Sequence, residues 1–140
     1  MNEFYQRTQA LIGEEALEKI KESHVAVFGV GGVGGFTVEA LARAGVGKLT
    51  LIDNDTVKES NINRQIIALN STLGLSKTEA FRLRINDINP DIIVETKEIF
   101  YLPETKDEID FSDFDYVVDA IDTVSGKIAI IEKATKEKYP

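Results

Sequence analysis

The stretch HVAVFGVGGVGGFTVEALARAG, residues 24–45, decides the fold that this chain can adopt. An apolar run at 25–29 meets a cluster of glycines, and the residues that follow, 33–44, have the pattern of a helix. Glycines at such a junction permit a tight turn and let the backbone come close to a phosphate group. The free N–H groups at the start of the helix then favour an anion. The stretch therefore predicts a strand, a phosphate-binding turn and a helix.

The glycine turn fits the pattern G-x-G-x-x-G, which is a weak signal on its own. Asp53 follows Gly34 by 19 residues and stands at the end of the next apolar run, where an acidic side chain can bind ribose hydroxyls. This context fits NAD and ATP equally, and the alternative is a turn whose glycines only allow close packing. The glycines of the turn are Gly29, Gly31, Gly32, Gly34 and Gly35.

Apolar runs and helical patterns alternate along the rest of the chain. Alternation at this spacing predicts an α/β fold, Rossmann-like and doubly wound, with a mainly parallel sheet, right-handed crossovers and helices on both faces. The expected strands are 25–29, 48–53, 92–98 and 115–120, and the expected helices are 3–22 with a break at Gly13, 33–44, 76–88 and 124–138.

Several side chains have structural interpretations as well as functional ones. His24, at the start of a strand and away from the ligand end, is expected to be structural or solvated. The acid-rich run 104–115 is expected to be a solvated connection, because it lacks the spacing of a calcium loop. Phe4, Tyr5, Leu11 and Ile12 either pack on their own domain or belong to a dimer interface, which is slightly favoured. The apolar sides expected of two helices are Leu11, Ile12, Leu17 and Ile20 in the first, and Ala80, Leu83 and Ile88 in the third.

The C-terminal part of the sequence bears on domain organisation. The apolar strand at 115–120 would lie at an open sheet edge, which natural domains rarely tolerate. Tyr139-Pro140 follows a helix at the point where a fifth strand would be expected. We therefore expect this chain to be the N-terminal part of a longer domain. The alternative is a small complete domain whose edge is covered by a partner chain.

Composition narrows the classes of function. Hydrophobic residues make up 43% of the 140 residues, as in a folded domain, and no segment approaches the length of a membrane span. The absence of cysteine excludes disulfides, a cysteine nucleophile and thiolate metal sites within these residues, and it suits a cytoplasmic protein. A net charge of −8 gives no general attraction to nucleic acid or to anionic membranes, so an RNA substrate would need a local basic patch.

The polar stretch after the second strand favours ATP over NAD. Arg64 offers a planar fork of donors for phosphate oxygens, and Lys77 offers a compact positive charge. Asn61 and Gln65 can add neutral hydrogen bonds. A dinucleotide has no general need for such cations at this place. An NAD-binding oxidoreductase or a non-catalytic nucleotide-binding module is the less favoured alternative.

A further acidic residue follows the fourth strand. Asp122 should lie at the carboxyl end of the parallel sheet, in the crevice shared by Asp53 and the glycine turn, because ligands bind there in open α/β sheets. Asp119, at the end of the strand itself, either satisfies backbone groups or lies near a metal ion. The sequence thus predicts that Asp53, Asp122 and the glycine turn lie together in one crevice at the carboxyl end of the sheet.

Five motifs in order carry a family resemblance. They are GVGGVG at 29–34, LIDND at 51–55, ESNINRQ at 59–65, GLSK at 74–77 and DAIDT at 119–123. Together they resemble the adenylating domain of the ubiquitin-activating-enzyme-like superfamily, which includes the thiamine and molybdopterin sulfur-carrier activating enzymes. The longer segments 7–20, 39–57 and 63–90 are similar to the tRNA threonylcarbamoyladenosine dehydratases. The resemblance runs from about Arg7 to the end of the sequence.

The resemblance implies roles for individual residues. The glycines cradle the nucleotide, Asp53 holds the ribose with Asp55 nearby, and Asp122 helps to hold Mg²⁺. Arg7 matches an N-terminal arginine that reaches the ATP of the partner chain in a homodimer. Gly35-Phe36 departs from the small polar residue and aromatic of many relatives. The implied catalytic residues are Arg64, Lys77, Asp122 and, in trans, Arg7; the implied nucleotide ligands are Gly29, Gly31, Gly32, Gly34, Asp53, Asp55, Asn61, Arg64, Gln65 and Lys77.

The resemblance also implies an activity and a division of the chain. Residues 1–23 would be an arm of helices that contributes to the dimer and the ATP site, and residues 24–140 an ATP-binding adenylating domain truncated at its C-terminal end. The reaction would be ATP-dependent adenylation of the threonylcarbamoyl carboxylate of a modified adenosine in tRNA, followed by cyclisation. The alternative substrate is the C-terminal glycine of a sulfur-carrier or ubiquitin-like protein. Relatives continue well beyond this length, so we expect the 140-residue piece alone to be inactive.

Overall fold

The structure is a computed structural model and describes residues 2–137. Every strand and helix expected from the sequence is present within these residues, with ends that differ by one or two positions. The expected end of the last helix at Lys138, and Tyr139-Pro140, lie outside the described residues. The elements are α1 (Gln6–Ile12), α2 (Glu14–Glu22), β1 (His24–Phe28), α3 (Gly32–Ala44), β2 (Lys48–Ile52), α4 (Lys77–Ile88), β3 (Ile93–Lys97), β4 (Tyr116–Asp119) and α5 (Val124–Glu137), with short 3-10 turns η1 (Glu3–Tyr5), η2 (Glu59–Asn61), η3 (Asn70–Thr72) and η4 (Lys106–Glu108).

The four strands form one parallel sheet in the order β3-β2-β1-β4. This is the arrangement of one half of a doubly wound fold, in which the strand order reverses beside β1. β4 is an edge strand among the described residues, as the sequence predicts. The reversal between β2 and β4 leaves room at the carboxyl end of β1, where the glycine turn emerges.

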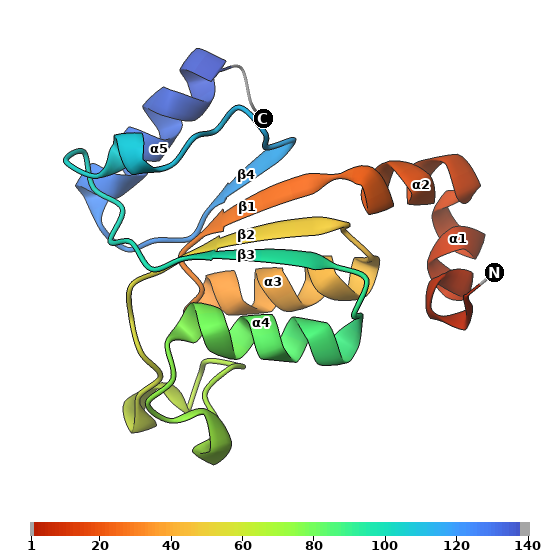
Figure 1. Cartoon of the computed structure of the whole chain (residues 1–140), viewed down its shortest axis with the longest axis horizontal. Helices are drawn as coiled ribbons and strands as arrows, with labels where there is room; N and C mark the ends of the chain where they lie inside the picture. Colours follow the sequence, from red (N-terminus) through yellow and green to blue (C-terminus); the bar gives the residue numbers. More distant parts are fainter. Residues whose placement is uncertain (1, 138–140) are drawn as a thin grey trace.

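Helices cover both faces of the sheet, as Figure 1 shows: α3 and α4 lie on one face, and α5 with the segment 99–114 lies on the other. β1 is buried along its whole length, which explains its unbroken apolar sequence. Burial of each large apolar side chain stabilises the fold by about 1.5–3 kcal/mol relative to exposure. The largest fully buried side chains are Phe28, Phe81, Phe111, Leu49, Leu51, Ile52, Ile67, Ile85, Ile130, Val27, Val30 and Val38.

A buried carboxylate joins α3 to α4. Glu39, 9% exposed, accepts two hydrogen bonds from Arg84, at 2.6 Å to Nε and 3.0 Å to Nη2, and one from Arg43 at 2.8 Å. The hydrogen bonds from Arg84 are the main reason that the pKa of Glu39 lies below its ordinary value. The two helices are therefore fixed to each other on the face of the sheet.

The expected apolar side of the first helices is wrong for part of its length. Leu17 is buried, but Leu11 is 85% exposed and Ile12 is 39% exposed. Gly13 adopts a positive φ of 86° between α1 and α2, and this bend directs α1 away from the sheet. On α4 the residues that pack on the sheet are Ala80, Phe81 and Ile85, while Leu83 is half exposed, contrary to expectation.

Tyr5 and His24 pack on their own domain. The Tyr5 hydroxyl accepts a hydrogen bond of 2.8 Å from Asn89 Nδ2, so the slight preference for an interface is wrong for this residue. The His24 ring is buried, with Nδ1 3.0 Å from the Asp113 carbonyl oxygen and Nε2 2.7 Å from Thr50 Oγ1. The structural interpretation of His24 is confirmed.

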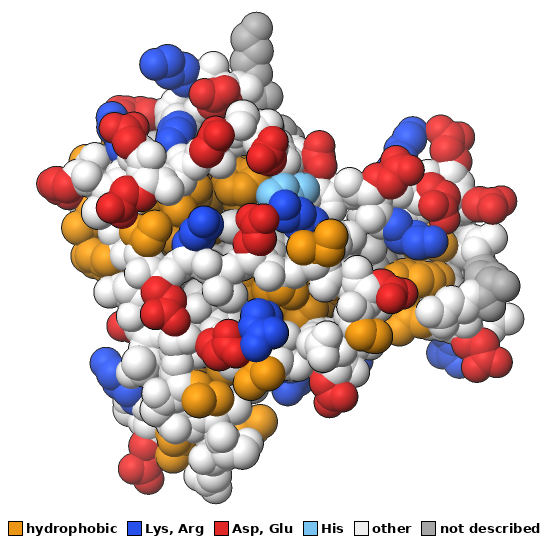
Figure 2. All heavy atoms as spheres, in the orientation of Figure 1, with side chains coloured by type: hydrophobic (Ala, Val, Ile, Leu, Met, Phe, Trp, Pro, Cys, Tyr) orange, Lys and Arg blue, Asp and Glu red, His pale blue; other side chains and the backbone are white. Residues whose placement is uncertain are grey.

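Charges on the face in Figure 2 are mixed, with acidic side chains scattered among lysines and arginines and no continuous basic area on that face of the described residues. Within 2–137, no helix has the length and apolar character needed to cross a membrane.

Candidate nucleotide-binding site

A pocket of about 630 Å³ opens at the carboxyl end of the sheet. Its wall includes a residue directly after each of three strands: Gly29 after β1, Asp53 after β2 and Ala120 after β4. This is the place where open α/β sheets bind ligands. The structure therefore brings together the motifs that the sequence places at one crevice.

The glycines of the turn divide into two kinds. Gly29 has a φ of 89°, and a Cβ there would lie 2.6 Å from the Ala120 carbonyl oxygen. A Cβ on Gly34 would overlap the Gly29 carbonyl, and Gly34 does not line the pocket. Gly31 and Gly32 line the pocket, and a Cβ on Gly32 would meet nothing within 4 Å, whereas one on Gly31 would lie 3.5 Å from Gln65 Nε2, an ordinary contact. Neither glycine is required by packing, so a ligand can approach their backbone closely. Packing thus accounts for Gly29 and Gly34, and ligand access for Gly31 and Gly32.

Three helices begin at this pocket. Gly32 is the first residue of α3, Lys77 is the first residue of α4, and Thr123 directly precedes α5; all three line the pocket. The first turn of α3 has no side-chain cap, so its N–H groups remain available to a ligand. Helix N-termini favour anions. The first turn of α4 is partly satisfied already, because Ser76 Oγ accepts from the Glu79 N–H and the Asp55 carbonyl oxygen accepts from the Lys77 N–H.

Asp53 holds the glycine turn in place. Its Oδ2 accepts a hydrogen bond of 3.0 Å from the Val30 N–H, and its Oδ1 accepts one of 2.8 Å from the Asp55 N–H. A carboxylate has about four acceptor positions, so two remain for a ligand. Asp53 is therefore both a support for the turn and a candidate for the ribose hydroxyls.

The two cations lie in different surroundings. Lys77 is 5% exposed, and its Nζ is 3.6 Å from Asp55 Oδ2. Arg64 is exposed, and its Nη1 donates to the Ser60 carbonyl oxygen at 3.0 Å and to Asn63 Oδ1 at 3.1 Å. Lys77 is buried because α4 packs on the sheet and covers its first residue.

Buried polar atoms without partners mark the pocket. Asn61 Oδ1 accepts from the Lys58 N–H at 2.9 Å and shapes the turn, but Gln65 Oε1 is buried and has no hydrogen-bond partner among the described residues. Tyr101 and Thr123 also line the pocket, and their buried hydroxyl groups likewise have no hydrogen-bond partner among the described residues. Such atoms are rare in folded proteins and are satisfied when a ligand or water binds.

Tyr101 and Thr123 were not singled out from the sequence. Burial raises the pKa of Tyr101 to about 12, so its hydroxyl is a neutral hydrogen-bonding group at neutral pH. Thr123 stands next to Asp122 in the motif DAIDT, which is a signal that could have identified it. Tyr101 lies in an irregular segment and has no comparable signal.

The acidic residues near α5 are not equivalent. Asp122 is exposed and lines the pocket. Asp119 accepts hydrogen bonds from Lys127 Nζ at 3.1 Å and from the Ile121 N–H at 3.3 Å, so the structure favours its interpretation as a structural residue. Within 2–137, no group of three His, Asp or Glu side chains could hold a metal ion. A single carboxylate fits Mg²⁺ that takes its other ligands from phosphates and water.

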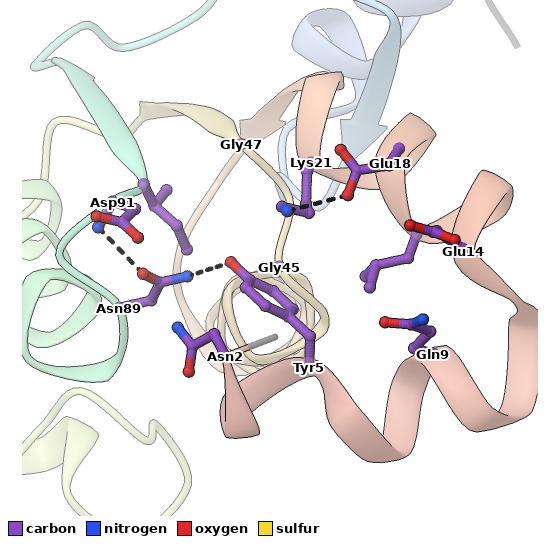
Figure 3. A pocket seen from close by; sticks show the side chains of 12 residues that line it. Asn2, Tyr5, Gln9, Glu14, Glu18, Lys21, Gly45, Gly47, Asn89 and Asp91 are labelled. Atoms are coloured by element: carbon purple, nitrogen blue, oxygen red, sulfur yellow. Dashed lines mark hydrogen bonds and ion pairs between the residues drawn. The ribbon is translucent and has the colours of Figure 1, made fainter.

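Arg7 is not part of this pocket. It is exposed on α1, and α1 and α2 lie near the amino ends of the strands (Figure 1). A second pocket, of about 550 Å³, lies at that end and is drawn in Figure 3; Arg7 does not line it either. The structure therefore does not bring Arg7 to the nucleotide pocket of its own chain.

Comparison with known proteins gives relatives of high similarity. The pattern of the ThiF family matches residues 5–140. The tRNA threonylcarbamoyladenosine dehydratase of Bacillus subtilis (strain 168) is 46% identical over 136 residues, which are 97% of this chain and 54% of that protein. The protein of the same name from Escherichia coli (strain K12) is 43% identical over 133 residues, 95% of this chain and 50% of that one.

A solved structure and a more distant relative extend the comparison. The crystal structure of E. coli tRNA N6-threonylcarbamoyladenosine dehydratase in complex with ATP has a TM-score of 0.94 and 41% identity, and covers 100% of this chain and 59% of that one. The adenylyltransferase and sulfurtransferase UBA4 of Vanderwaltozyma polyspora is 40% identical over 111 residues, 79% of this chain and 25% of that protein. The chain spans about half the length of the tRNA dehydratases that it matches.

Proposed function

The chain belongs to the ThiF family, and from that premise we propose that it binds ATP and serves the adenylation of a carboxylate. The observation that carries the proposal is the meeting of three helix N-termini with the buried cation of Lys77 in one pocket. Such an arrangement suits a polyphosphate better than a dinucleotide with two phosphates. The similarity to an ATP complex at 41% identity supports this choice.

The chain's own residues would bind and orient the nucleotide. Asp53 accepts hydrogen bonds from the ribose, and the N–H groups around Gly31 and Gly32 contact phosphate oxygens. Lys77 and Arg64 neutralise the charge that grows on the leaving pyrophosphate. Gln65 Oε1 is an acceptor for a ligand donor, and Asn61 supports the wall of the site. Asp122 would hold Mg²⁺, which would supply further neutralisation of the pyrophosphate charge.

Adenylation makes a poor electrophile reactive. An oxygen of the substrate carboxylate attacks the α-phosphorus in line, the bond to the bridging oxygen breaks, and pyrophosphate leaves. The product is a mixed anhydride of the carboxylic acid and AMP. No covalent bond to the protein forms, so catalysis rests on alignment and on charge neutralisation.

For the substrate, we propose the threonylcarbamoyl group of a modified adenosine in tRNA. A nitrogen of the carbamoyl group attacks the activated carboxyl carbon and loses its proton to solvent, the ring closes, and AMP leaves with the oxygen of the former carboxylate. The names of the two bacterial relatives support this substrate. Ring closure of this kind needs no enzyme thiol, and the sequence has no cysteine.

The second candidate substrate is the C-terminal glycine of a sulfur-carrier or ubiquitin-like protein. The name of the relative from Vanderwaltozyma polyspora favours it. Both substrates undergo the same first step, so the nucleotide pocket alone does not separate them. We also propose a cytoplasmic homodimer in which Arg7 completes the partner's site, because Arg7 is exposed and does not line its own pocket.

Binding and exchange experiments test the proposal. Isothermal titration of the complete gene product with ATP·Mg²⁺, ADP and NAD should give binding of the adenine nucleotides and not of NAD. ATP–pyrophosphate exchange by the complete gene product should depend on tRNA that carries the threonylcarbamoyl group and not on a carrier protein. Binding of NAD without binding of ATP would contradict the proposed cofactor, and exchange that depends on a carrier protein would favour the second substrate.

A further inference from the structure

The side chain that faces Lys77 is an acid, which is unexpected in a pocket for polyphosphate. Asp55 Oδ2 lies 3.6 Å from Lys77 Nζ, and the Asp55 carbonyl oxygen accepts a hydrogen bond of 3.0 Å from the Lys77 N–H. We propose that Asp55 is a positioning residue that holds the Lys77 ammonium in the ligand-free pocket and releases it to a phosphate group. The inference rests on the proposed binding of ATP and changes the role of Asp55 from nucleotide ligand to placeholder.

Burial of the two partners is unequal. The Lys77 side chain is 6% exposed, whereas the Asp55 side chain is 55% exposed. A buried ammonium without a counter-charge is costly, so Lys77 needs a partner at all times. Asp55 remains hydrated when the pair separates, so it can give up Lys77 at little cost. At 3.6 Å the contact is also longer than a charge-assisted hydrogen bond, which leaves the ammonium held but not locked.

Hydrogen bonds fix Asp55 between the two elements that would bind phosphate. The Asp55 N–H donates to Asp53 Oδ1, and Asp53 Oδ2 accepts from the Val30 N–H in the glycine turn. On the other side, Thr56 pairs with Ser76 directly before α4. The contacts therefore run without a gap from the glycine turn through Asp53 and Asp55 to Lys77. This chain of contacts sets where the ammonium stands relative to the turn.

A ligand role and a placeholder role for Asp55 predict effects of opposite sign. If Asp55 bound the ribose, its loss would weaken the binding of ATP. If it competes with phosphate for Lys77, its loss removes the competitor, so ATP binds more tightly. Removal of the Asp55 carboxylate also leaves the Lys77 ammonium less well placed for the reaction, so turnover should fall.

The test is Asp55→Asn in the complete gene product. The change is made once with Lys77 present and once together with Lys77→Met. By titration calorimetry, Asp55→Asn should tighten the binding of ATP·Mg²⁺ about two- to fivefold, the range of a half-exposed ion pair. In the complete gene product, kcat for pyrophosphate exchange should fall about tenfold, since misplacement of a catalytic group is costly. With Lys77→Met, Asp55→Asn should change ATP affinity by no more than the control does.

The matched control is Asp87→Asn. It removes one exposed carboxylate from α4, the helix that begins with Lys77, ten residues after that lysine. It should leave affinity and kcat unchanged within about 1.5-fold, as expected for a surface charge. Weaker ATP binding by Asp55→Asn would overturn the inference in favour of a nucleotide contact. An equal effect in the Lys77→Met chain would also overturn it, because Asp55 would then not act through Lys77. Absence of ATP binding by the unaltered complete gene product would instead refute the proposed function itself.

Discussion

The two ends of the parallel sheet hold pockets of similar size that differ in which ends of the helices face them. At the carboxyl end, in a pocket of about 630 Å³, helices α3, α4 and α5 begin, and the cations Lys77 and Arg64 stand with the acids Asp53, Asp55 and Asp122. At the amino end, in a pocket of about 550 Å³, α3 and α4 have ended, and the acids Glu14, Glu18 and Asp91 stand with Lys21 (Figure 3). The direction of these helices therefore favours an anion at the carboxyl end of the sheet and disfavours one at the amino end.

The polar atoms of the two pockets differ in another way. At the amino end, Asn89 Nδ2 donates to the Tyr5 hydroxyl and Asn89 Oδ1 accepts from the Asp91 N–H. At the carboxyl end, buried oxygens of Gln65 and Tyr101 have no partner within the described chain. A hollow whose polar atoms satisfy one another is a joint between elements, whereas a hollow with unsatisfied atoms is suited to a ligand. Size alone does not distinguish the two.

The largest effect is expected from Lys77→Met, which removes the buried cation of the carboxyl end. Loss of one or two charge-assisted hydrogen bonds of about 1.5–3 kcal/mol each should weaken ATP binding tenfold or more, and exchange of pyrophosphate should fall about 100-fold or more. The control is Lys21→Met at the amino end, which should leave both values unchanged. Equal losses in the two variants, measured by calorimetry and exchange, would abolish the distinction between the pockets.

Mixed dimers test whether the two ends cooperate between chains. Arg7→Ala and Lys77→Ala should each be inactive alone, because each removes a cation from every site. If Arg7 acts in trans, a mixed dimer has one site with both changes and one with neither, so about half of the normal activity returns. If mass spectrometry shows mixed dimers and exchange is not restored, Arg7 has only a local role.

Asp53→Ala should affect binding and folding together, since Asp53 supports the glycine turn as well as facing the pocket. Loss of the hydrogen bonds from the Val30 and Asp55 N–H groups should lower the free energy of unfolding by about 2 kcal/mol. ATP affinity should fall about tenfold, as expected for one lost charge-assisted bond. Denaturant unfolding and calorimetry measure the two effects. Affinity within twofold of the parent would show that Asp53 supports the turn without binding the ribose.

Tyr5→Phe tests the joint at the amino end and should not reach the nucleotide. The change removes the hydroxyl that accepts from Asn89 Nδ2 and leaves that buried donor without a partner. The free energy of unfolding should fall by about 1 kcal/mol, with ATP affinity unchanged. A change in affinity larger than that of the Lys21→Met control would show that the two ends are coupled within one chain.

The smallest effect is the contribution of His24 to pH dependence. The pKa of His24 lies below its ordinary value of 6.5. Burial is the main cause, and the positive charge of Lys48 is the next. The unfolded chain therefore binds a proton at higher pH than the folded chain, so this contribution to stability is complete above about pH 6.5 and is lost as the pH falls below that value. With His24→Gln, chemical unfolding should show a smaller loss of stability between about pH 8 and pH 5. An identical loss in the two proteins would assign the pH dependence to other groups.

The sequence predicted the features that follow from local pattern. Period and turn chemistry were enough for each strand and helix, and the glycine turn and Asp53 are at the carboxyl end of the sheet as expected. The burial of Lys77 was not predictable in this way, because it depends on how α4 packs on the sheet. Tyr101 reaches the pocket through an irregular segment whose path no periodic pattern describes.

Errors in the predicted apolar sides have a similar cause. Helical spacing places Leu11 and Leu17 on related sides only if the axis is continuous, and the bend at Gly13 interrupts it. Within the turn, the pattern G-x-G-x-x-G does not separate glycines that allow packing from those that face a ligand. That division needs the position of Ala120, which comes from a strand far along the sequence.

The contact of Glu39 with Arg84 has a consequence for the kinetics of nucleotide capture. The Glu39 side chain is 11% exposed and the Arg84 side chain 29% exposed, and two hydrogen bonds between them hold α3 against α4. Gly32 and Lys77 are the first residues of these two helices, so the distance between the two helix N-termini is fixed. A polyphosphate must match that distance when it arrives. Entry of the ligand then requires no closing of the helices, and its association rate should depend on ionic strength through electrostatic steering rather than on a slow conformational step.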